Sequence, residues 1–326
     1  MSNNKLQVIS SEPPSSNQKK FPEKPQTHQL QARLDRMWLV DPKQFDPLRN
    51  CVERERIART EKLLAAIPKK SGATAIDLGC GMGILTKKLR DNGWKVEALD
   101  ASSLALKKLK ESHAEGIECL QDLIPDTRLP DDHYDLVVST DVIAYLSPNE
   151  YRLYFSELAR IVKADGKVLC SSPIDVRSDD SLERFGSFAE TEFAIDRWKF
   201  SYHRLYIRLK RMFEAPSRYY RASIDKDFYQ LELQKKQGFS KTWFQWNSSR
   251  ILGLFWKCSA VILTPLTSLL RENRTLALTL EKLTQLIWGR EGISHVIFVG
   301  HRRTLELPTK DDLESVEPRG KRQVWE

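Results

Sequence analysis

The sequence contains little cysteine, and its cysteines form no recognisable pattern. Five occur in 326 residues, at positions 51, 80, 119, 170 and 258, and they include neither a Cys-x-x-Cys pair nor a cluster with histidine. An odd number of scattered thiols excludes a disulfide scaffold and supplies no set of metal ligands. We therefore predict reduced thiols, no bound metal and a cytoplasmic protein.

A long apolar run is missing from the first twenty residues, so we expect no secretory leader there. A strong charge of one sign is missing too. The 52 basic and 44 acidic side chains leave a net charge of +8, which permits an anionic partner without requiring one. The hydrophobic fraction of 40% is ordinary for a globular chain and excludes a wholly disordered or fibrous protein.

Two terminal segments lack periodic hydrophobic residues, and we expect residues 1–30 and 307–326 to be disordered tails. Residues 31–173 begin with helices, and short apolar strands then alternate with amphipathic helices. The expected strands are 74–78, 95–99, 117–120, 134–139 and 167–171, and the expected helices are 50–67, 84–91, 103–112 and 151–162. Such alternation is typical of a parallel, doubly wound α/β sheet, whose ligands bind beyond the carboxyl ends of the strands.

The pattern changes after residue 173. We expect residues 174–290 to form a helical, aromatic-rich cap, inserted before a last strand within residues 291–306. That strand is expected to return to the sheet antiparallel, at an edge. The predicted fold is thus a mostly parallel, seven-stranded, Rossmann-like sheet with a helical insertion before its last strand.

A glycine-rich turn follows the first expected strand, in Ala75-Ile-Asp-Leu-Gly-Cys-Gly-Met-Gly83. Glycine lets the chain turn tightly and lets a ligand approach the backbone, and the next helix offers free amides to an anionic group. The spacing G-x-G-x-G departs from the G-x-G-x-x-G of dinucleotide-binding folds. An acid at the turn, Asp77, suits an ammonium group better than a pyrophosphate, which favours S-adenosylmethionine over NAD.

Two further acids end the next two expected strands. Asp100 follows Gly83 by about one helix and one strand, and a carboxylate there can accept hydrogen bonds from both hydroxyls of a ribose. Asp122 ends the third strand, within reach of an adenine amino group. Three acids at successive strand ends are hard to explain as solvated loop residues.

These features resemble the class I S-adenosylmethionine-dependent methyltransferases, especially those that act on small molecules and lipids. The resemblance covers about a third of the chain, in six segments that occur in the expected order. They are residues 75–83, 97–100, 120–122, 129–130, 134–146 and 158–173.

The resemblance implies a role for each matched residue. Gly79, Cys80, Gly81 and Gly83 would lie beside the methionine portion of S-adenosyl-L-methionine, and Asp77 would help to orient it. Asp100 would hold the ribose, Asp122 the adenine, and Thr140 and Asp141 would line the pocket near the methyl group. The stretch from Asp122 to Leu129 is longer than usual in the family, which leaves Asp126 as an alternative adenine partner.

The sulfonium of this cofactor is already electrophilic, so methyl transfer by direct in-line displacement needs no metal. Positioning of the acceptor can contribute about 7–11 kcal/mol, and a base is needed only where the acceptor loses a proton. Asp141 is the first candidate base, although it is equally interpretable as a helix cap. Tyr145 is a candidate for the acceptor wall, and His203 is a weaker candidate that we expect at the surface.

The acceptor class is narrowed by two missing motifs. No Asp/Asn-Pro-Pro-Tyr turn follows the fourth strand, where the sequence reads Ser139-Thr-Asp-Val, and no Pro-Cys pair typical of cytosine methylation occurs. The favoured hypothesis is O- or C-methylation of a small or lipid-like acceptor. An RNA or protein acceptor is the alternative. A non-catalytic module that binds the cofactor is disfavoured because the glycines and acids are intact.

Two stretches bear on partners. Residues 197–221 carry eight Lys/Arg, one acid and seven aromatics, which suits nucleic acid, a membrane interface or simply a cap helix. Residues 251–270 have the length of a membrane span, but Lys257 and Pro265 interrupt them and a strand of the sheet follows. We instead expect a helical hairpin with the stripe Leu276, Leu280, Leu283 and Ile287, either buried in the cap or resting on a membrane. The oligomeric state stays open.

Overall fold

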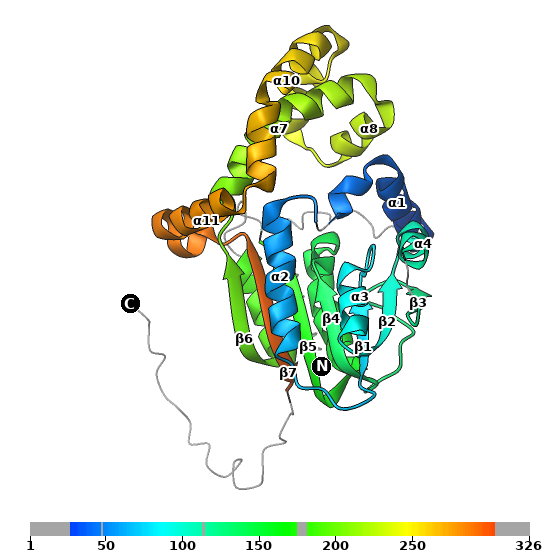
Figure 1. Ribbon diagram of the computed structural model, residues 1–326. Coiled ribbons are helices and arrows are strands. Elements are labelled where there is room, and N and C mark those ends of the chain that lie inside the picture. The colour runs from blue at the N-terminus through cyan, green and yellow to red at the C-terminus, as the bar shows by residue number, and fades with distance from the viewer. Residues whose placement is uncertain (1–26, 47, 113–114, 175–180, 304–326) are drawn as a thin grey trace, which may run out of the picture.

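The computed structural model describes residues 27–46, 48–112, 115–174 and 181–303 (Figure 1). Both predicted tails therefore lie outside the described residues, except that residues 27–30 belong to the first helix. The strands are β1 (Thr74–Leu78), β2 (Lys95–Asp100), β3 (Glu118–Gln121), β4 (Tyr134–Thr140), β5 (Val162–Pro173), β6 (Phe193–Ser201) and β7 (His295–Arg302).

The α-helices surround and extend this sheet. They are α1 (Thr27–Val40), α2 (Cys51–Ala65), α3 (Ile84–Asp91), α4 (Ser103–Glu111), α5 (Tyr151–Ile161), α6 (Ser181–Glu192), α7 (Arg204–Ile224), α8 (Lys226–Gln234), α9 (Gly238–Asn247), α10 (Arg250–Glu272) and α11 (Arg274–Trp288). Short 3-10 helices are η1 (Pro42–Phe45), η2 (Val142–Tyr145), η3 (Pro148–Glu150) and η4 (Gly289–Gly292).

The seven strands form one sheet in the order β3-β2-β1-β4-β5-β7-β6. The first five are parallel, and β7 pairs antiparallel with β5 and with β6. The predicted fold class, a mostly parallel Rossmann-like sheet, is therefore confirmed, as is the antiparallel direction of the last strand. Its predicted place at an edge is wrong, because β7 lies between β5 and β6.

Strand β6 lies inside the segment that was expected to be helical. Its sequence, FAIDRWKFS, does not alternate cleanly, because the register shifts between Ile195 and Arg197 and several charged side chains face water at the sheet edge. A strand exposed on one side and interrupted by a bulge loses the period of two that identifies strands in a sequence.

The core has two layers, one on each face of the sheet. Adjacent residues of β1 show the division, since Ala75 packs with the α2 and α3 side chains Leu64 and Leu89, whereas Ile76 packs with Tyr154 and Phe155 of α5. Neighbouring strand residues point to opposite faces, so an apolar run such as this one fills both layers. The sheet is thereby fixed on both sides, with its carboxyl edge left for a ligand.

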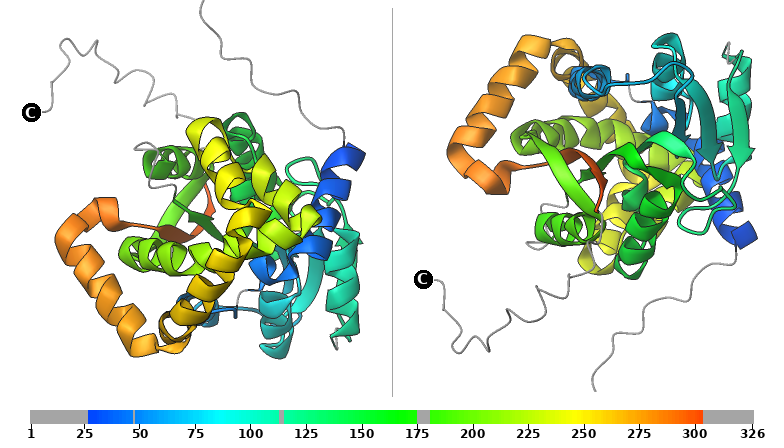
Figure 2. Two further views of the ribbon diagram at one scale, coloured as in Figure 1. Left: turned by 90° about the horizontal axis from the view of Figure 1, so that it is seen from above. Right: turned by 90° about the horizontal axis from the view of Figure 1, so that it is seen from below.

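Helices α7 and α10 pack against each other along an arm that projects above the carboxyl edge (Figures 1 and 2). The predicted hairpin between residues 251–270 and the stripe of α11 is therefore not formed. Helix α11 packs instead against α2 and α7, with Leu280 buried but Leu283 and Ile287 exposed. In the described part of the chain, α10 is the one helix whose length and composition would allow a membrane crossing.

Candidate cofactor and acceptor site

A cavity of about 590 Å³ opens at the carboxyl ends of the parallel strands. It brings together most of the residues selected from the sequence: Asp77, Gly79, Cys80, Gly81, Asp100, Asp122, Thr140, Asp141 and Tyr145. Two selected residues lie elsewhere, because neither Gly83 nor Asp126 lines the cavity. Carboxylates that are far apart in the sequence thus share one cleft.

The glycine turn is held by the next strand. The amides of Gly79 and Cys80 donate to the Leu99 carbonyl at 2.7 and 3.1 Å, and the Gly81 amide donates to Oδ2 of Asp100 at 2.9 Å. Gly79, Gly81 and Gly83 all have φ between +52° and +72°, a region that glycine enters without strain. Asp100 therefore shapes the turn as well as facing the cavity, and its burial raises its pKa.

Asp77 lies beneath this turn and is almost fully buried. The Thr86 hydroxyl of α3 donates to Oδ2 of Asp77 at 2.6 Å. Burial raises the pKa of Asp77 to about 7, and the nearby carboxylate of Asp100 adds to that shift. A carboxyl group poised to ionise near neutrality would be stabilised in its charged form by a bound cation.

Gly83 has a structural place in the turn. It is the N-cap of α3, with φ of +72°, and a Cβ added there would lie 2.2 Å from Cδ1 of Leu109. Only glycine fits such a close approach between the turn and α4. The prediction that Gly83 lies beside a ligand is thus not matched by its position, although the third glycine of the motif is explained.

The two candidate adenine partners separate clearly. Asp122 lines the cavity, and it accepts from the backbone amides of Leu123 and Arg128 at 2.9 and 3.0 Å. These hydrogen bonds, with the Arg128 guanidinium, outweigh burial and lower the pKa of Asp122. Asp126 is exposed to solvent. The geometry therefore favours Asp122 for any contact with a ligand.

Asp141 is at the centre of an ionic network. Its Oδ1 accepts from the Ser171 hydroxyl at 2.9 Å and lies 2.6 Å from Nε2 of His295, while its Oδ2 pairs with Arg56 at 3.0 Å. Arg56 also pairs with Glu53, which pairs in turn with Arg49. Despite its burial, Arg56 and His295 hold the pKa of Asp141 well below its usual range.

The backbone of Asp141 is strained, with φ of +64° in the left-handed region. Such residues gather at functional sites, where the surrounding structure holds them in place. The hydrogen bonds to Ser171 and His295 supply that restraint. They also occupy both lone pairs of Oδ1, and Arg56 pairs with Oδ2, so the geometry does not favour the base role for Asp141.

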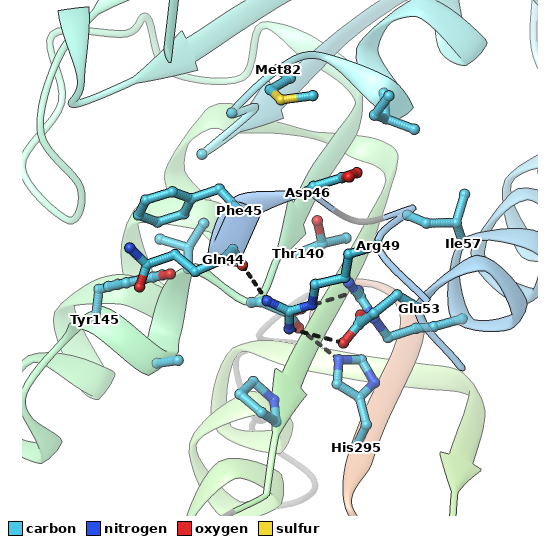
Figure 3. Close-up of a pocket in the computed structure, with 18 of the residues that line it drawn as sticks. Gln44, Phe45, Asp46, Arg49, Glu53, Ile57, Met82, Thr140, Tyr145 and His295 are labelled. Atoms are coloured by element: carbon cyan, nitrogen blue, oxygen red, sulfur yellow. Dashed lines mark hydrogen bonds and ion pairs between the residues drawn. The ribbon is translucent and has the colours of Figure 1, made fainter. Parts of the chain in front are cut away.

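His295, at the start of β7, is better placed to accept a proton. Because Asp141 is ionised, Nε2 of His295 must carry the hydrogen that this carboxylate accepts, and a neutral ring then has its lone pair on Nδ1. That Nδ1 is buried, with no hydrogen-bond partner in the described ranges, and His295 lines the cavity. Figure 3 shows His295 on the same side of the cavity as Arg49 and Glu53, opposite Phe45 and Tyr145.

His203 also lines the cavity, and the expectation that it lies at the surface is wrong. It is 4% exposed, and burial lowers its pKa. Both of its ring nitrogens lack a hydrogen bond among the residues described, although Nε2 lies 3.7 Å from Glu281. Two buried imidazoles with free nitrogens in one wall indicate a polar ligand group that would satisfy them.

The N-terminal helices cover the cavity. Trp38 of α1 stacks on Phe45 of η1 with ring centroids 4.4 Å apart, and both line the cavity beside Tyr145. Asp35 anchors α1 to the start of α4, accepting from the hydroxyls of Ser102 and Ser103 at 2.5 and 2.9 Å. Aromatic rings thus exclude water from one side of the site.

The basic aromatic segment 197–221 does not form one surface. Its first residues belong to β6 and the rest to α7, where Ile207, Lys210 and Arg211 line the cavity. Arg208 lies over the Trp288 ring at 5.7 Å, and Arg221 pairs with Asp41 at 2.9 Å. Several of its cations are therefore used within the molecule.

The sequence reasoning missed Arg49, Glu53 and Arg56. Glu53 and Arg56 are three residues apart and lie on one face of α2, and Arg49 comes just before that helix. This run of charged residues would have been the signal, but only the apolar residues of the helix were considered. His295 was missed because it begins an apolar strand. In the described part of the chain, no group of three or more His, Cys, Asp or Glu side chains is arranged to hold a metal ion.

Comparison with known proteins defines the class. Residues 76–170 match the family model described as a methyltransferase domain. The match covers β2, β3, β4 and parts of β1 and β5, and it shows in this part of the chain a class I methyltransferase domain of the kind that uses S-adenosylmethionine.

Individual relatives are more distant. The chain is 31% identical over 134 residues to a malonyl-[acyl-carrier protein] O-methyltransferase of Pectobacterium atrosepticum, covering 40% of this chain and 52% of the relative. It is 25% identical over 148 residues to the cyclopropane-fatty-acyl-phospholipid synthase of Escherichia coli, covering 45% and 35%. It is 26% identical over 128 residues to the phosphoethanolamine N-methyltransferase 1 of Triticum aestivum, and this match covers 38% of this chain and 26% of the relative. The matches thus span about half or less of these relatives.

Solved structures are similar in part. One is the PH0226 protein of Pyrococcus horikoshii, with 22% identity, a TM-score of 0.41, and coverage of 45% of this chain and 84% of that one. Another is a phosphoethanolamine N-methyltransferase 2 of Haemonchus contortus in complex with S-adenosylhomocysteine. It has 16% identity and a TM-score of 0.43, and the match covers 74% of this chain and 51% of that one.

The residues of the cavity fit S-adenosylmethionine. Gly79 and Gly81, which have no Cβ, line the cavity next to the buried carboxyl of Asp77, whose pKa is about 7. That carboxyl suits the ammonium of the methionine portion, Asp100 can accept from ribose hydroxyls, and Asp122 can accept from an amino group. The charge and hydrogen-bond types of these residues therefore fit the ammonium, the ribose and the adenine amino group.

Proposed function

We propose that this chain transfers the methyl group of S-adenosylmethionine to an oxygen or carbon atom of a small or lipid-like acceptor. One observation carries the proposal: the cavity that is lined by the three strand-end carboxylates also contains the Asp141–His295 pair. A hydroxyl or a carbon acceptor loses a proton when it is methylated, and a buried histidine with a free nitrogen can take that proton.

Each part of the cavity has a task in this proposal. Bound S-adenosylmethionine supplies the electrophilic methyl group. Asp77, Asp100 and the glycine turn bind and orient it, and Trp38 with Phe45 excludes water. Nδ1 of His295 accepts the proton of the acceptor, while Asp141 holds the ring and stabilises the imidazolium that forms, as a carboxylate does in other carboxylate–histidine pairs.

Other residues that line the cavity support a compact or lipid-like acceptor. The lining of the cavity also includes Ile57, Tyr206 and Ile207, with the cations of Lys210 and Arg211 one turn along α7. This mixture suits a molecule with an apolar body and an anionic group. Relatives named for acyl-carrier protein, phospholipid and phosphoethanolamine substrates are consistent with that class.

The test is to incubate the protein with methyl-labelled S-adenosylmethionine and a cell extract, and then to separate lipid, RNA, protein and small-molecule fractions. We expect label in the lipid or small-molecule fraction with the wild type, and far less in the same incubation time with His295→Asn. Label confined to RNA or protein would reject the proposed acceptor class, and equal labelling by both proteins would reject the proposed base.

A further inference from the structure

Helix α10 exposes a continuous apolar face, which we call the outer stripe. Its large members are 43–92% exposed, a high value for such side chains: Ile251, Leu254, Phe255, Val261, Ile262, Leu266 and Leu269. At 100° per residue they fall within an arc of about 140°, and from first to last they extend about 27 Å along the helix. Scattered exposed leucines need no explanation, but a stripe of this length does.

The opposite face of α10 is already occupied by α7. Gly253 is buried so closely against α7 that a Cβ there would lie 3.1 Å from the Ser223 hydroxyl. Trp256 packs on Tyr219 with ring centroids 5.0 Å apart, and Leu270 is buried at the far end. The outer stripe is therefore a face that the fold leaves open, and not the exposed side of a loosely placed helix.

The preceding helix adds an aromatic tip, formed by Phe239, Trp243 and Trp246 of α9. These residues are 80%, 48% and 62% exposed, and consecutive ring centroids lie 6.1 and 5.9 Å apart. Tryptophan and phenylalanine next to water are typical of the boundary between lipid headgroups and acyl chains. Two residues separate α9 from α10, so the tip lies next to the start of the outer stripe along the chain.

The charged residues around the outer stripe favour a membrane over a second copy of the chain as its partner. Residues 238–274 contain five basic side chains, Lys241, Arg250, Lys257, Arg271 and Arg274, and one acid, Glu272. Lys241, Arg250 and Lys257 have no acidic side chain within 4 Å among the residues placed in the structure. Two copies that met through the stripe would bring these cations together, whereas an anionic bilayer would neutralise them.

The charges on α10 and on the neighbouring helix α7 indicate how α10 is oriented relative to a membrane. Arg250 and Lys257 are seven residues apart, so they lie close together in angle along one edge of the outer stripe. Helix α7 lies beside α10 and carries Arg208, Lys210 and Arg211 (Figures 1 and 2). A crossing of the bilayer would take these charges with it, so α10 is suited to lie in the plane of the surface.

We propose that the outer stripe and the aromatic tip dock the protein on an anionic lipid bilayer, with α10 in the plane of the headgroups. The docking does not require the proposed function. The consequence of docking for catalysis does rest on the proposed function. Because α7 contacts the membrane-facing helix on one side and lines the cavity on the other, docking brings a lipid-like acceptor close to the site.

The test uses the full chain and co-sedimentation with vesicles, in the absence of S-adenosylmethionine. We expect binding to phosphatidylcholine vesicles that contain phosphatidylserine, and weaker binding to phosphatidylcholine alone. The double variant Phe255→Glu/Ile262→Glu should weaken binding at least about tenfold, because it places two charges in the apolar face. Arg250→Glu/Lys257→Glu should remove the preference for anionic vesicles.

The matched control is Leu153→Glu, a charge placed at an equally exposed leucine of α5. It should bind vesicles like the wild type, and calorimetric binding of S-adenosylmethionine shows that each variant is folded. Unchanged binding by Phe255→Glu/Ile262→Glu, or no vesicle binding by the wild type, would overturn the proposal. A wild-type dimer that this double variant dissociates, without vesicle binding, would assign the stripe to a second copy. None of these outcomes depends on methyl transfer.

Discussion

Nε2 of His295 lies 2.6 Å from Oδ1 of Asp141, although 154 residues separate them in the sequence. The sheet brings them together because Asp141 follows β4, His295 begins β7, and β5 lies between these two strands. The antiparallel return of β7 places its first residue at the carboxyl edge. A strand that continued the parallel pattern would have put His295 at the opposite edge, away from the cavity.

His295→Asn tests the proton-accepting role. Asparagine keeps a donor for Asp141 but has no basic nitrogen, so we expect kcat to fall by about a hundredfold to ten-thousandfold, the usual contribution of general-base catalysis. Steady-state rates at saturating S-adenosylmethionine measure kcat for the wild type and the variant, with the acceptor that the labelling experiment identifies. A kcat within twofold of the wild type would contradict the assignment.

Asp77 predicts an unusual dependence of stability on pH. Its pKa is about 7 in the folded protein and 3.8 ordinarily, so between these values the folded protein keeps a proton that the unfolded chain has lost. The free energy of unfolding of the wild type should therefore fall as pH rises from about 4 to about 7. Asp77→Asn removes this penalty and should be more stable than the wild type at pH 8, by up to about 4 kcal/mol, but not at pH 4. Urea unfolding without the cofactor measures the difference.

The same variant should bind S-adenosylmethionine less tightly. A hydrogen-bonded charge pair with the ammonium contributes about 1.5–3 kcal/mol, so Asp77→Asn should raise Kd by about tenfold to a hundredfold at pH 8. In the wild type, Kd should rise as pH falls below about 7, because the carboxyl takes up a proton. Calorimetry across this range, with Asp126→Asn as the control, checks the prediction. A wild-type Kd that is independent of pH would mean that Asp77 does not face the ammonium.

The sequence was sufficient to predict the sheet core, because each of its strands carries its own apolar pattern. The predicted helix 84–91 has the same first and last residues in the structure, because Gly83 marks its start and a charged last turn marks its end. The glycine turn and the acids at 77, 100 and 122 were also found from local sequence, because each lies in or directly after an apolar strand pattern. Strand β6 was missed because its bulge interrupts the alternation of buried and exposed side chains.

The side of the cavity with Asp141 and His295 was harder to predict, because it depends on contacts between distant segments. Nothing near Asp141 in the sequence indicates that Arg56 and His295 bind its carboxylate. Likewise, the partner of α10 is α7 and not the helix that follows it. Apolar stripes show that a helix packs against something, but they do not specify against what.

Gly79 tests how closely the turn is packed. Its φ is +71°, and a Cβ there would lie 2.3 Å from Cγ2 of Val142. We expect Gly79→Ala to lower the free energy of unfolding by about 2–5 kcal/mol, from left-handed strain of about 1–2 kcal/mol and overpacking of about 1–3 kcal/mol. Gly116→Ala is the matched control, with φ of +74° and no atom within 4 Å of the added Cβ. It should show the strain alone. Equal thermal shifts of the two variants would mean that Val142 moves away freely.

Asp100→Ala tests the ribose contact and the shape of the turn together. The carboxylate accepts from the Gly81 and Ser102 amides at 2.9 and 2.8 Å, so its loss should loosen the turn as well as remove an acceptor for hydroxyl groups. We expect calorimetry to show a Kd for S-adenosylmethionine raised by a hundredfold or more, since two hydrogen bonds to a charged group contribute about 1.5–3 kcal/mol each. Asp100→Asn separates the two effects. Its amide oxygen can still accept from Gly81, so the turn should persist, and its weaker acceptor should raise Kd by only about tenfold. Equal heats of binding for the wild type and Asp100→Ala would remove Asp100 from the cofactor site, and the ribose would then have to be held by another group.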